Sequence, residues 1–173
     1  MIRALLLKGM IFTENSEKAR ALAKKHAYGA LMSDGRVRLS WLEVVFLASI
    51  GKVEVVDFRS RIVPFDDLMR KASRAEHDFA TRYVVFSDLR KKGYVVKTAL
   101  KFGADFRVYD KGVLPGQDHA RWIVYPVRES SKLTWQDFAS KNRVAHSTKK
   151  SLLIAVVDDE FDVTYWEVGW LKP

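Results

Sequence analysis

Three side chains in the stretch from Tyr94 to Lys150 have the types that proton transfer and charge stabilisation require. Tyr109 can take a proton, His119 can give one, and Lys150 can hold the negative charge that develops between them. Together these types can cleave RNA without a metal, because the substrate's own 2′-hydroxyl is then the nucleophile. The products of such a cut would be a 2′,3′-cyclic phosphate and a 5′-hydroxyl.

Each of these residues also has an ordinary reading. A tyrosine at a strand end commonly packs, and a histidine in a loop is commonly solvated. Lys149 stands beside Lys150 and competes with it for any role. The residue types alone therefore do not show that Tyr109, His119 and Lys150 converge.

The sequence predicts no metal site and no cofactor. None of the four histidines has a histidine or carboxylate partner at the helical spacing that zinc enzymes use. No Asp or Glu stands two residues before a Lys, the spacing of a common metal-dependent nuclease core. Both observations argue against metal-dependent cleavage, although distant residues could still supply ligands.

The overall charge points to an acidic partner. The chain has 173 residues, a formal net charge of +9, a pI of about 9.8 and no cysteine. Because the basic residues are spread through the predicted helices and loops, they suit a folded surface that binds nucleic acid. A basic protein without such a partner is the alternative. We find no cleavable signal and no apolar run of membrane-spanning length, and therefore expect a cytoplasmic protein that does not enter membranes.

The first third of the chain reads as a small mixed α/β unit. Residues 3–13 predict two strands, and Ser16 predicts the N-cap of a helix. Ser40 with Glu43 predicts a capping box on a second helix, and residues 53–56 predict a strand.

Helices and strands also alternate in the remainder, after a boundary at Pro64. Helices are predicted over 65–75, 77–92 and from 134 onward, where Trp135, Phe138 and Val144 are candidate core residues. Strands are predicted over 94–97, 105–109, 121–127, 152–157 and 163–170.

A family resemblance covers nearly the whole chain. The segments Leu89-Arg-Lys-Lys-Gly-Tyr-Val-Val-Lys97 and Lys101-Phe-Gly-Ala-Asp-Phe-Arg-Val-Tyr109, then His119, Lys150 and the strand after it, resemble the catalytic domain of the archaeal tRNA-splicing endonuclease. His119 follows Tyr109 by ten residues and Lys150 follows His119 by thirty-one, which fits the family. Gly29, residues 39–43 and residues 51–55 resemble the family's N-terminal domain.

The resemblance implies a fold and a set of residue roles. We expect an α/β (α+β) fold: an N-terminal mixed α/β domain (1–63), a helical connector (64–78) and a C-terminal nuclease domain (79–173) with a central mixed sheet flanked by helices. It implies Tyr109 as general base, His119 as general acid and Lys150 as stabiliser of the transition-state charge. It also implies a clamp on a flipped bulge base, formed by Arg143 and either Trp170, our choice, or Trp166.

The implied substrate is precursor tRNA folded into a bulge–helix–bulge, from which the intron is excised. The acidic turn 158–162 is expected to dock into a basic pocket of another subunit, through Asp159 and Glu160. The expected assembly has four units, either two catalytic chains with two structural paralogues or four identical chains. Two rival functions stay open: a non-catalytic RNA-binding or structural subunit of the same fold, and a metal-dependent structure-specific nuclease.

Overall fold

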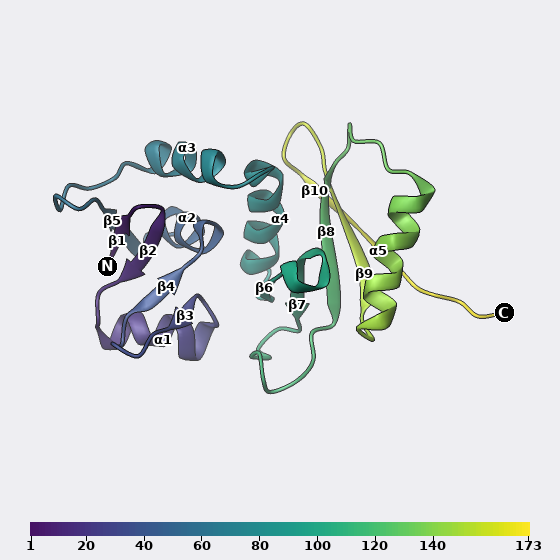
Figure 1. Cartoon of the computed structure of the whole chain (residues 1–173), viewed down its shortest axis with the longest axis horizontal. Coiled ribbons are helices and arrows are strands. Elements are labelled where there is room, and N and C mark those ends of the chain that lie inside the picture. Colours follow the sequence, from purple (N-terminus) through teal and green to yellow (C-terminus); the bar gives the residue numbers. More distant parts are fainter. The chain divides into compact units, whose positions relative to one another are not determined.

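The computed structural model describes the whole chain, from Met1 to Pro173, as two compact units (Figure 1). The first unit spans Met1–Ala80 and the second spans Thr81–Pro173. Each unit has its own five-stranded sheet with helices packed against it, so the predicted mixed α/β fold is confirmed. No helix is both long and apolar enough to cross a membrane.

The first unit is built on a sheet of strand order β3-β4-β2-β1-β5, in which β1 pairs antiparallel with β2 and parallel with β5. Its strands are β1 (Ile2–Leu7), β2 (Met10–Thr13), β3 (Ala30–Leu31), β4 (Val37–Leu39) and β5 (Val53–Val56). Its helices are α1 (Glu17–His26), α2 (Trp41–Ser49) and α3 (Phe65–Ala75).

Both predicted helix caps of this unit are confirmed. The Ser16 hydroxyl accepts a hydrogen bond from a backbone N–H in the first turn of α1. The Ser40–Glu43 capping box is complete, and the buried Glu43 carboxylate also accepts the Gly29 N–H at 2.7 Å. Gly29 has a φ of +64°, and a Cβ there would lie 2.5 Å from the Arg38 carbonyl oxygen. Only glycine therefore fits at this position. The hydrogen bond from Gly29 to Glu43 links α2 to the loop before β3.

The second unit has a sheet of strand order β10-β9-β8-β7-β6. The β8–β9 pair is parallel and the other pairs are antiparallel. Its strands are β6 (Val95–Ala99), β7 (Ala104–Tyr109), β8 (Trp122–Arg128), β9 (Ser151–Val157) and β10 (Val163–Val168). Its helices are α4 (Phe79–Lys91), which begins just before the unit boundary, a 3₁₀ turn η1 (Leu100–Phe102) and α5 (Trp135–Ser147).

Helices cover both faces of this sheet, with α4 on one side and α5 on the other (Figure 1). On the α5 side, Ile123 and Leu152 are fully buried in a cluster that includes Ala145 of the helix. On the α4 side, Phe86 packs on Phe106 with ring centroids 6.1 Å apart. The sheet is therefore a rigid support from which loops at its ends can present side chains.

Two details of the second unit differ from the sequence prediction. The prediction that Trp135 belongs to the core is wrong. Trp135 is 85% exposed, because it occupies the first turn of α5 and contacts Phe138 only edge-on. The last strand ends at Val168 rather than at residue 170, and Gly169 follows it. Trp170 therefore lies outside the strand, and strand alternation does not relate it to Trp166.

Candidate active site

Backbone pairing brings the end of β7 and the starts of β8 and β9 together at one end of the second sheet. Val108, near the end of β7, pairs with Trp122 at the start of β8, and Trp122 pairs with Ser151 at the start of β9. The Arg121 N–H donates to the Val108 carbonyl at 2.8 Å, and the Ser151 N–H donates to the Arg121 carbonyl at 3.1 Å. The residues next to these pairs must therefore lie side by side.

Those neighbouring residues are Tyr109, Arg121 and Lys150. Each stands one position from a paired residue, so the register places them in one row across β7, β8 and β9. Because side chains alternate along strands, Tyr109 and Arg121 share the sheet face of Ile123, which is the face covered by α5. Two of the three residues with candidate catalytic chemistry thus meet at one edge, together with an arginine that the sequence did not single out.

Tyr109 closes β7 with its side chain 4% exposed. The guanidinium carbon of Arg107, two residues earlier on the same strand face, lies 5.9 Å from the Tyr109 ring centroid. A packing surface and a cation therefore fix the position of the tyrosine ring.

Lys150 follows the end of α5, where Lys149 adopts the left-handed conformation at φ +56°. The Lys150 N–H donates to the Ala145 carbonyl at 2.9 Å, and its ammonium donates to the Thr148 carbonyl at 2.8 Å. Burial lowers the pKa of the Lys150 ammonium below its usual value, and the nearby charge of Arg107 lowers this pKa further. Lys149 is exposed whereas Lys150 is half-buried, and both lysines line the same pocket.

His119 lies in the loop between β7 and β8, two residues before Arg121, and it is exposed. Its backbone N–H donates to the Asp118 carboxylate at 2.7 Å. Earlier in the loop, the Gln117 amide oxygen accepts the Leu114 N–H at 3.0 Å. The loop therefore has local order and returns the histidine to the end of the sheet where Tyr109 lies.

A pocket of about 440 Å³ opens beside Lys150. Its lining includes Arg121, His146, Lys149, Lys150 and Trp170. Its surface thus combines cationic groups with flat aromatic rings, the two features that bind the phosphates and bases of single-stranded nucleic acid. Tyr109 and His119 do not line this pocket.

Trp170, one predicted clamp residue, lines the pocket, whereas the other, Arg143, is exposed on α5 and does not. The Trp170 ring packs on His146, with centroids 4.4 Å apart and planes tilted by 40°. His146 stands three residues after Arg143 in α5, so the two side chains are neighbours on the surface of the helix. Trp166 lies on β10 opposite Ile154, outside the pocket.

Sequence reasoning missed Arg121 and His146. Arg121 could have been noticed because it stands just before a predicted strand and two residues after a candidate acid. His146 could have been noticed from its spacing of three to Arg143 within one predicted helix.

The acidic turn between β9 and β10 is a tight, ordered loop. Asp158 accepts hydrogen bonds from the N–H groups of Glu160 and Asp162, each at 2.9 Å. Asp159, Glu160 and Phe161 are all exposed, and Phe161 has a left-handed φ of +65°. The turn therefore presents two free carboxylates and one aromatic ring on a fixed backbone.

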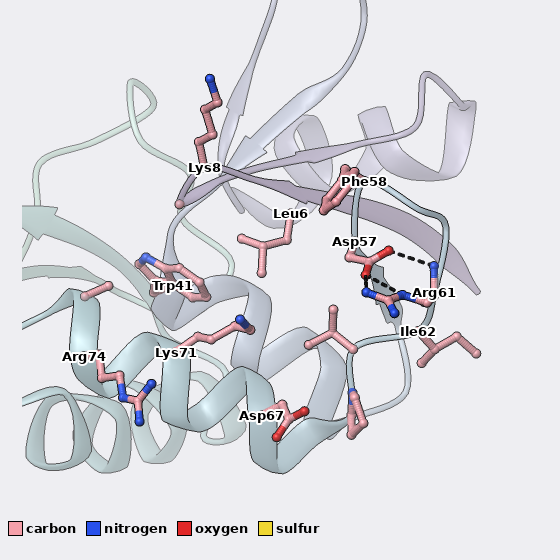
Figure 2. Close-up of a pocket in the computed structure, with 14 residues that line it drawn as sticks. Leu6, Lys8, Trp41, Asp57, Phe58, Arg61, Ile62, Asp67, Lys71 and Arg74 are labelled. Carbon is pink, nitrogen blue, oxygen red and sulfur yellow. Dashed lines mark hydrogen bonds and ion pairs between the residues drawn. The ribbon is translucent and has the colours of Figure 1, made fainter.

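The first unit contains a larger groove, of about 830 Å³ (Figure 2). Leu6 and Trp41 contribute apolar surface, and Lys8, Lys71 and Arg74 bring positive charge to it from the turn after β1 and from α3. At the other end of the groove Asp57 accepts hydrogen bonds from Arg61, whose backbone N–H is the first cause of the lowered pKa of the Asp57 carboxyl. The lining has four basic residues against two acidic ones, Asp57 and Asp67, so the groove has a net positive character.

The structure contains no group of three or more His, Cys, Asp or Glu side chains that could hold a metal ion. The cations at the edge of the second sheet are Lys and Arg side chains.

Comparison with known proteins identifies both units. The profile of the tRNA intron endonuclease catalytic C-terminal domain matches residues 79–165, and that of the tRNA intron endonuclease N-terminal domain matches residues 2–69. The tRNA-splicing endonuclease of Thermococcus kodakarensis is 36% identical over 172 residues, 99% of each chain. That of Pyrococcus furiosus is 40% identical over 160 residues, 91% of each chain, and that of Nanoarchaeum equitans is 40% identical over 141 residues, 78% of this chain and 90% of the relative. The chain therefore belongs to the tRNA intron endonuclease family and has both its N-terminal and its catalytic domain.

Proposed function

We propose that this tRNA intron endonuclease cuts precursor tRNA at bulge–helix–bulge motifs, without a metal, by attack of the substrate 2′-hydroxyl. The cut leaves a 2′,3′-cyclic phosphate and a 5′-hydroxyl. The observation that carries the proposal is the strand register that sets Tyr109 and Lys150 in one row, with His119 on the loop that joins β7 to β8. Within the family's catalytic domain, this is a complete set of groups for metal-free cleavage.

Tyr109 removes the proton of the 2′-hydroxyl and His119 protonates the leaving 5′-oxygen. The exposed position of His119 suits a group that must reach a substrate held outside the sheet. The Lys150 ammonium, half-buried and fixed by the Thr148 carbonyl, stabilises the charge on the pentacoordinate phosphate. A fixed cation in a partly water-excluded site is worth more there than in bulk solvent.

Arg143 and Trp170 hold a base that leaves the bulge. Trp170 offers a flat face next to Lys150, and Arg143 lies one helical turn from the histidine that Trp170 contacts. A guanidinium plane and an indole ring both stack on an unpaired base. Recognition by shape and by splayed bases fits a substrate defined by its bulges rather than by its sequence.

The acidic turn docks onto another chain in an assembly of four units. Asp159 and Glu160 are the contact residues, and their exposure on an ordered turn supports this role. The groove of the first unit is a suitable receiver, because Lys71 and Arg74 supply the opposite charge next to apolar surface. Two catalytic chains with two structural paralogues is our preferred composition, and four identical chains is the alternative.

The test incubates the full chain in excess EDTA with a bulge–helix–bulge RNA and analyses the product ends. One control RNA has the bulges closed into a continuous helix, and a second has a 2′-deoxynucleotide at each cleavage position. We expect cyclic-phosphate ends from the bulge–helix–bulge RNA and from neither control, because the closed helix offers no splayed base and the deoxy RNA has no nucleophile.

Other outcomes separate the rival functions. Cleavage that requires magnesium, or that leaves 5′-phosphates, would establish a metal-dependent nuclease instead. RNA binding without cleavage calls for addition of a candidate structural paralogue. If the mixture is then active and His119→Ala in this chain leaves its rate unchanged, the chain is a non-catalytic subunit.

A further inference from the structure

A second cation lies near Tyr109, on the strand that ends at the tyrosine, and its charge acts on Lys150. Arg107 faces the same side of the sheet as Ile123, with which it pairs across β7 and β8. Its guanidinium carbon is 5.9 Å from the Tyr109 ring centroid. The arginine is thus fixed next to a proposed catalytic residue by the same strand.

No partner in the chain neutralises this guanidinium. The Arg107 Nε is buried and makes no hydrogen bond, and the side chain makes no ion pair. The nearest carboxylates along the strand are engaged elsewhere: Asp105 pairs with Arg82 at 2.8 Å, and Asp110 pairs with Arg121 at 3.2 Å. The Nε atoms of Arg82 and Arg90 are also buried without a hydrogen bond, but Arg82 has the Asp105 carboxylate beside it, whereas Arg107 has no carboxylate. A buried donor without a partner is costly, and a ligand oxygen at the Arg107 guanidinium would supply the missing acceptor.

The ligand must be an anion. The charge of Arg107 acts on Lys150, where it adds to the effect of burial in lowering the pKa of the lysine. Two cations held close together repel each other, and only negative charge placed between them relieves this repulsion. An arginine fork matches the geometry of phosphate oxygens.

We propose that Arg107 is a further catalytic residue, which binds a non-bridging oxygen of the scissile phosphate together with Lys150. This inference rests on the proposed function and deepens it. Lys150 would supply a point charge and Arg107 a planar pair of donors, so that the phosphate is held in a fixed orientation toward Tyr109. Charge that develops on the phosphate in the transition state would then meet two preorganised donors.

The test uses Arg107→Met, which keeps the apolar stem that packs on the sheet, and Arg107→Lys, which keeps the charge without the fork. Lys101→Met is the matched control, because it removes an exposed cation from the neighbouring 3₁₀ turn, where the ammonium lies over Phe102. Single-turnover cleavage of bulge–helix–bulge RNA is measured at saturating enzyme. We expect a loss of about 100-fold for Arg107→Met, which is the scale of removing one fixed donor, a smaller loss for Arg107→Lys, and none for the control.

A second measurement does not depend on cleavage. Each protein is titrated with two short oligonucleotides that differ only in ending with a 3′-phosphate or a 3′-hydroxyl. The wild-type chain should bind the phosphate form more tightly, by about 10-fold, and Arg107→Met should lose this preference while Lys101→Met keeps it. Addition of guanidinium ions, but not urea at the same concentration, should partly restore the rate of Arg107→Met.

The outcomes distinguish the two proposals. If the wild-type chain prefers the 3′-phosphate through Arg107 yet never cleaves RNA, the proposed function fails and the phosphate site stands. If Arg107→Met cleaves at the wild-type rate and keeps the phosphate preference, the inference is overturned. A third outcome would show that Arg107 only supports the fold around Tyr109. In that case Arg107→Met would cleave more slowly and melt at a lower temperature, but it would keep the phosphate preference and would not be rescued by guanidinium.

Discussion

The identity of the aromatic clamp can be tested by removing each of two tryptophans in turn. Trp170 lines the pocket beside Lys150, whereas Trp166 lies four residues earlier on β10 and does not. The two side chains are 60% and 62% exposed, so truncation of either removes a similar ring and costs the fold little. We therefore expect Trp170→Ala to weaken binding of bulge–helix–bulge RNA, and Trp166→Ala to leave it nearly unchanged.

The size of the effect follows from the geometry of the ring. One face of Trp170 contacts His146 at 4.4 Å, and its exposed fraction leaves surface on which a base can stack. Base–aromatic stacking contributes about 1–3 kcal/mol per base. At about 1.4 kcal/mol per tenfold change, this corresponds to a Kd raised roughly 5- to 150-fold. Displacement of His146 by the base would sacrifice an aromatic contact of about 0.5–1.5 kcal/mol and move the loss to the lower end of this range.

The assay is a binding titration with an RNA whose cleavage nucleotides are 2′-deoxy, at a fixed salt concentration because phosphate contacts make affinity salt-dependent. A second RNA replaces the flipped bulge nucleotide with an abasic one. If Trp170 stacks on that base, wild-type protein should lose affinity for the abasic RNA by at least this factor. Trp170→Ala should lose less than wild type does, because only the Arg143 contact with the base is left to lose.

Two results would refute this reasoning. A weakened Trp166→Ala beside a normal Trp170→Ala would assign the clamp to β10. Equal penalties for the abasic RNA in wild type and Trp170→Ala would mean that Trp170 contributes to binding without contacting the base.

Three further predictions concern the acid, the assembly and the fold. His119→Ala should lower the single-turnover rate by roughly 10²–10⁴-fold with RNA binding kept; loss of both would make the residue structural. Charge reversal at Asp159 and Glu160 should shift the protein to smaller species in size-exclusion chromatography, and an unchanged profile would remove the docking role. Hydrogen bonds from Thr134 hold the pKa of the Asp137 carboxyl below its usual value of 3.8. The ionised carboxylate therefore stabilises the folded protein at neutral pH, and this contribution is lost as the pH falls from about 3.8 through the lower pKa of the folded state. Acid unfolding followed by circular dichroism should therefore reach its midpoint at lower pH in wild type than in Asp137→Asn, whose neutral side chain already weakens the cap at every pH.

Much of the local structure could be predicted because its causes are local. The caps at Ser16 and Ser40 join groups three residues apart, so the residue types themselves specify the hydrogen bonds. The two strands predicted over residues 3–13 are likewise present, as β1 and β2. The family resemblance added the residues of the proposed chemistry, since their types and order are properties of the chain alone.

Which residues come together in the site depends on tertiary structure. The parallel pairing of β8 with β9 brings Lys150 beside Arg121, and no local pattern specifies that pairing. The contact of His146 with Trp170 joins α5 to the segment after the last strand, which the sequence had read as strand.

Burial was likewise decided by the whole fold. Trp135 was predicted to be in the core from its side chain, but its place in the first turn of α5 leaves it in solvent. Arg107 read as one of many basic residues, and only the packed sheet shows that its Nε is buried without an acceptor. The order and types of the residues specify which elements form and which chemical groups are present. The tertiary structure determined which of those groups meet, because contacts between distant residues depend on the packing of all the elements together.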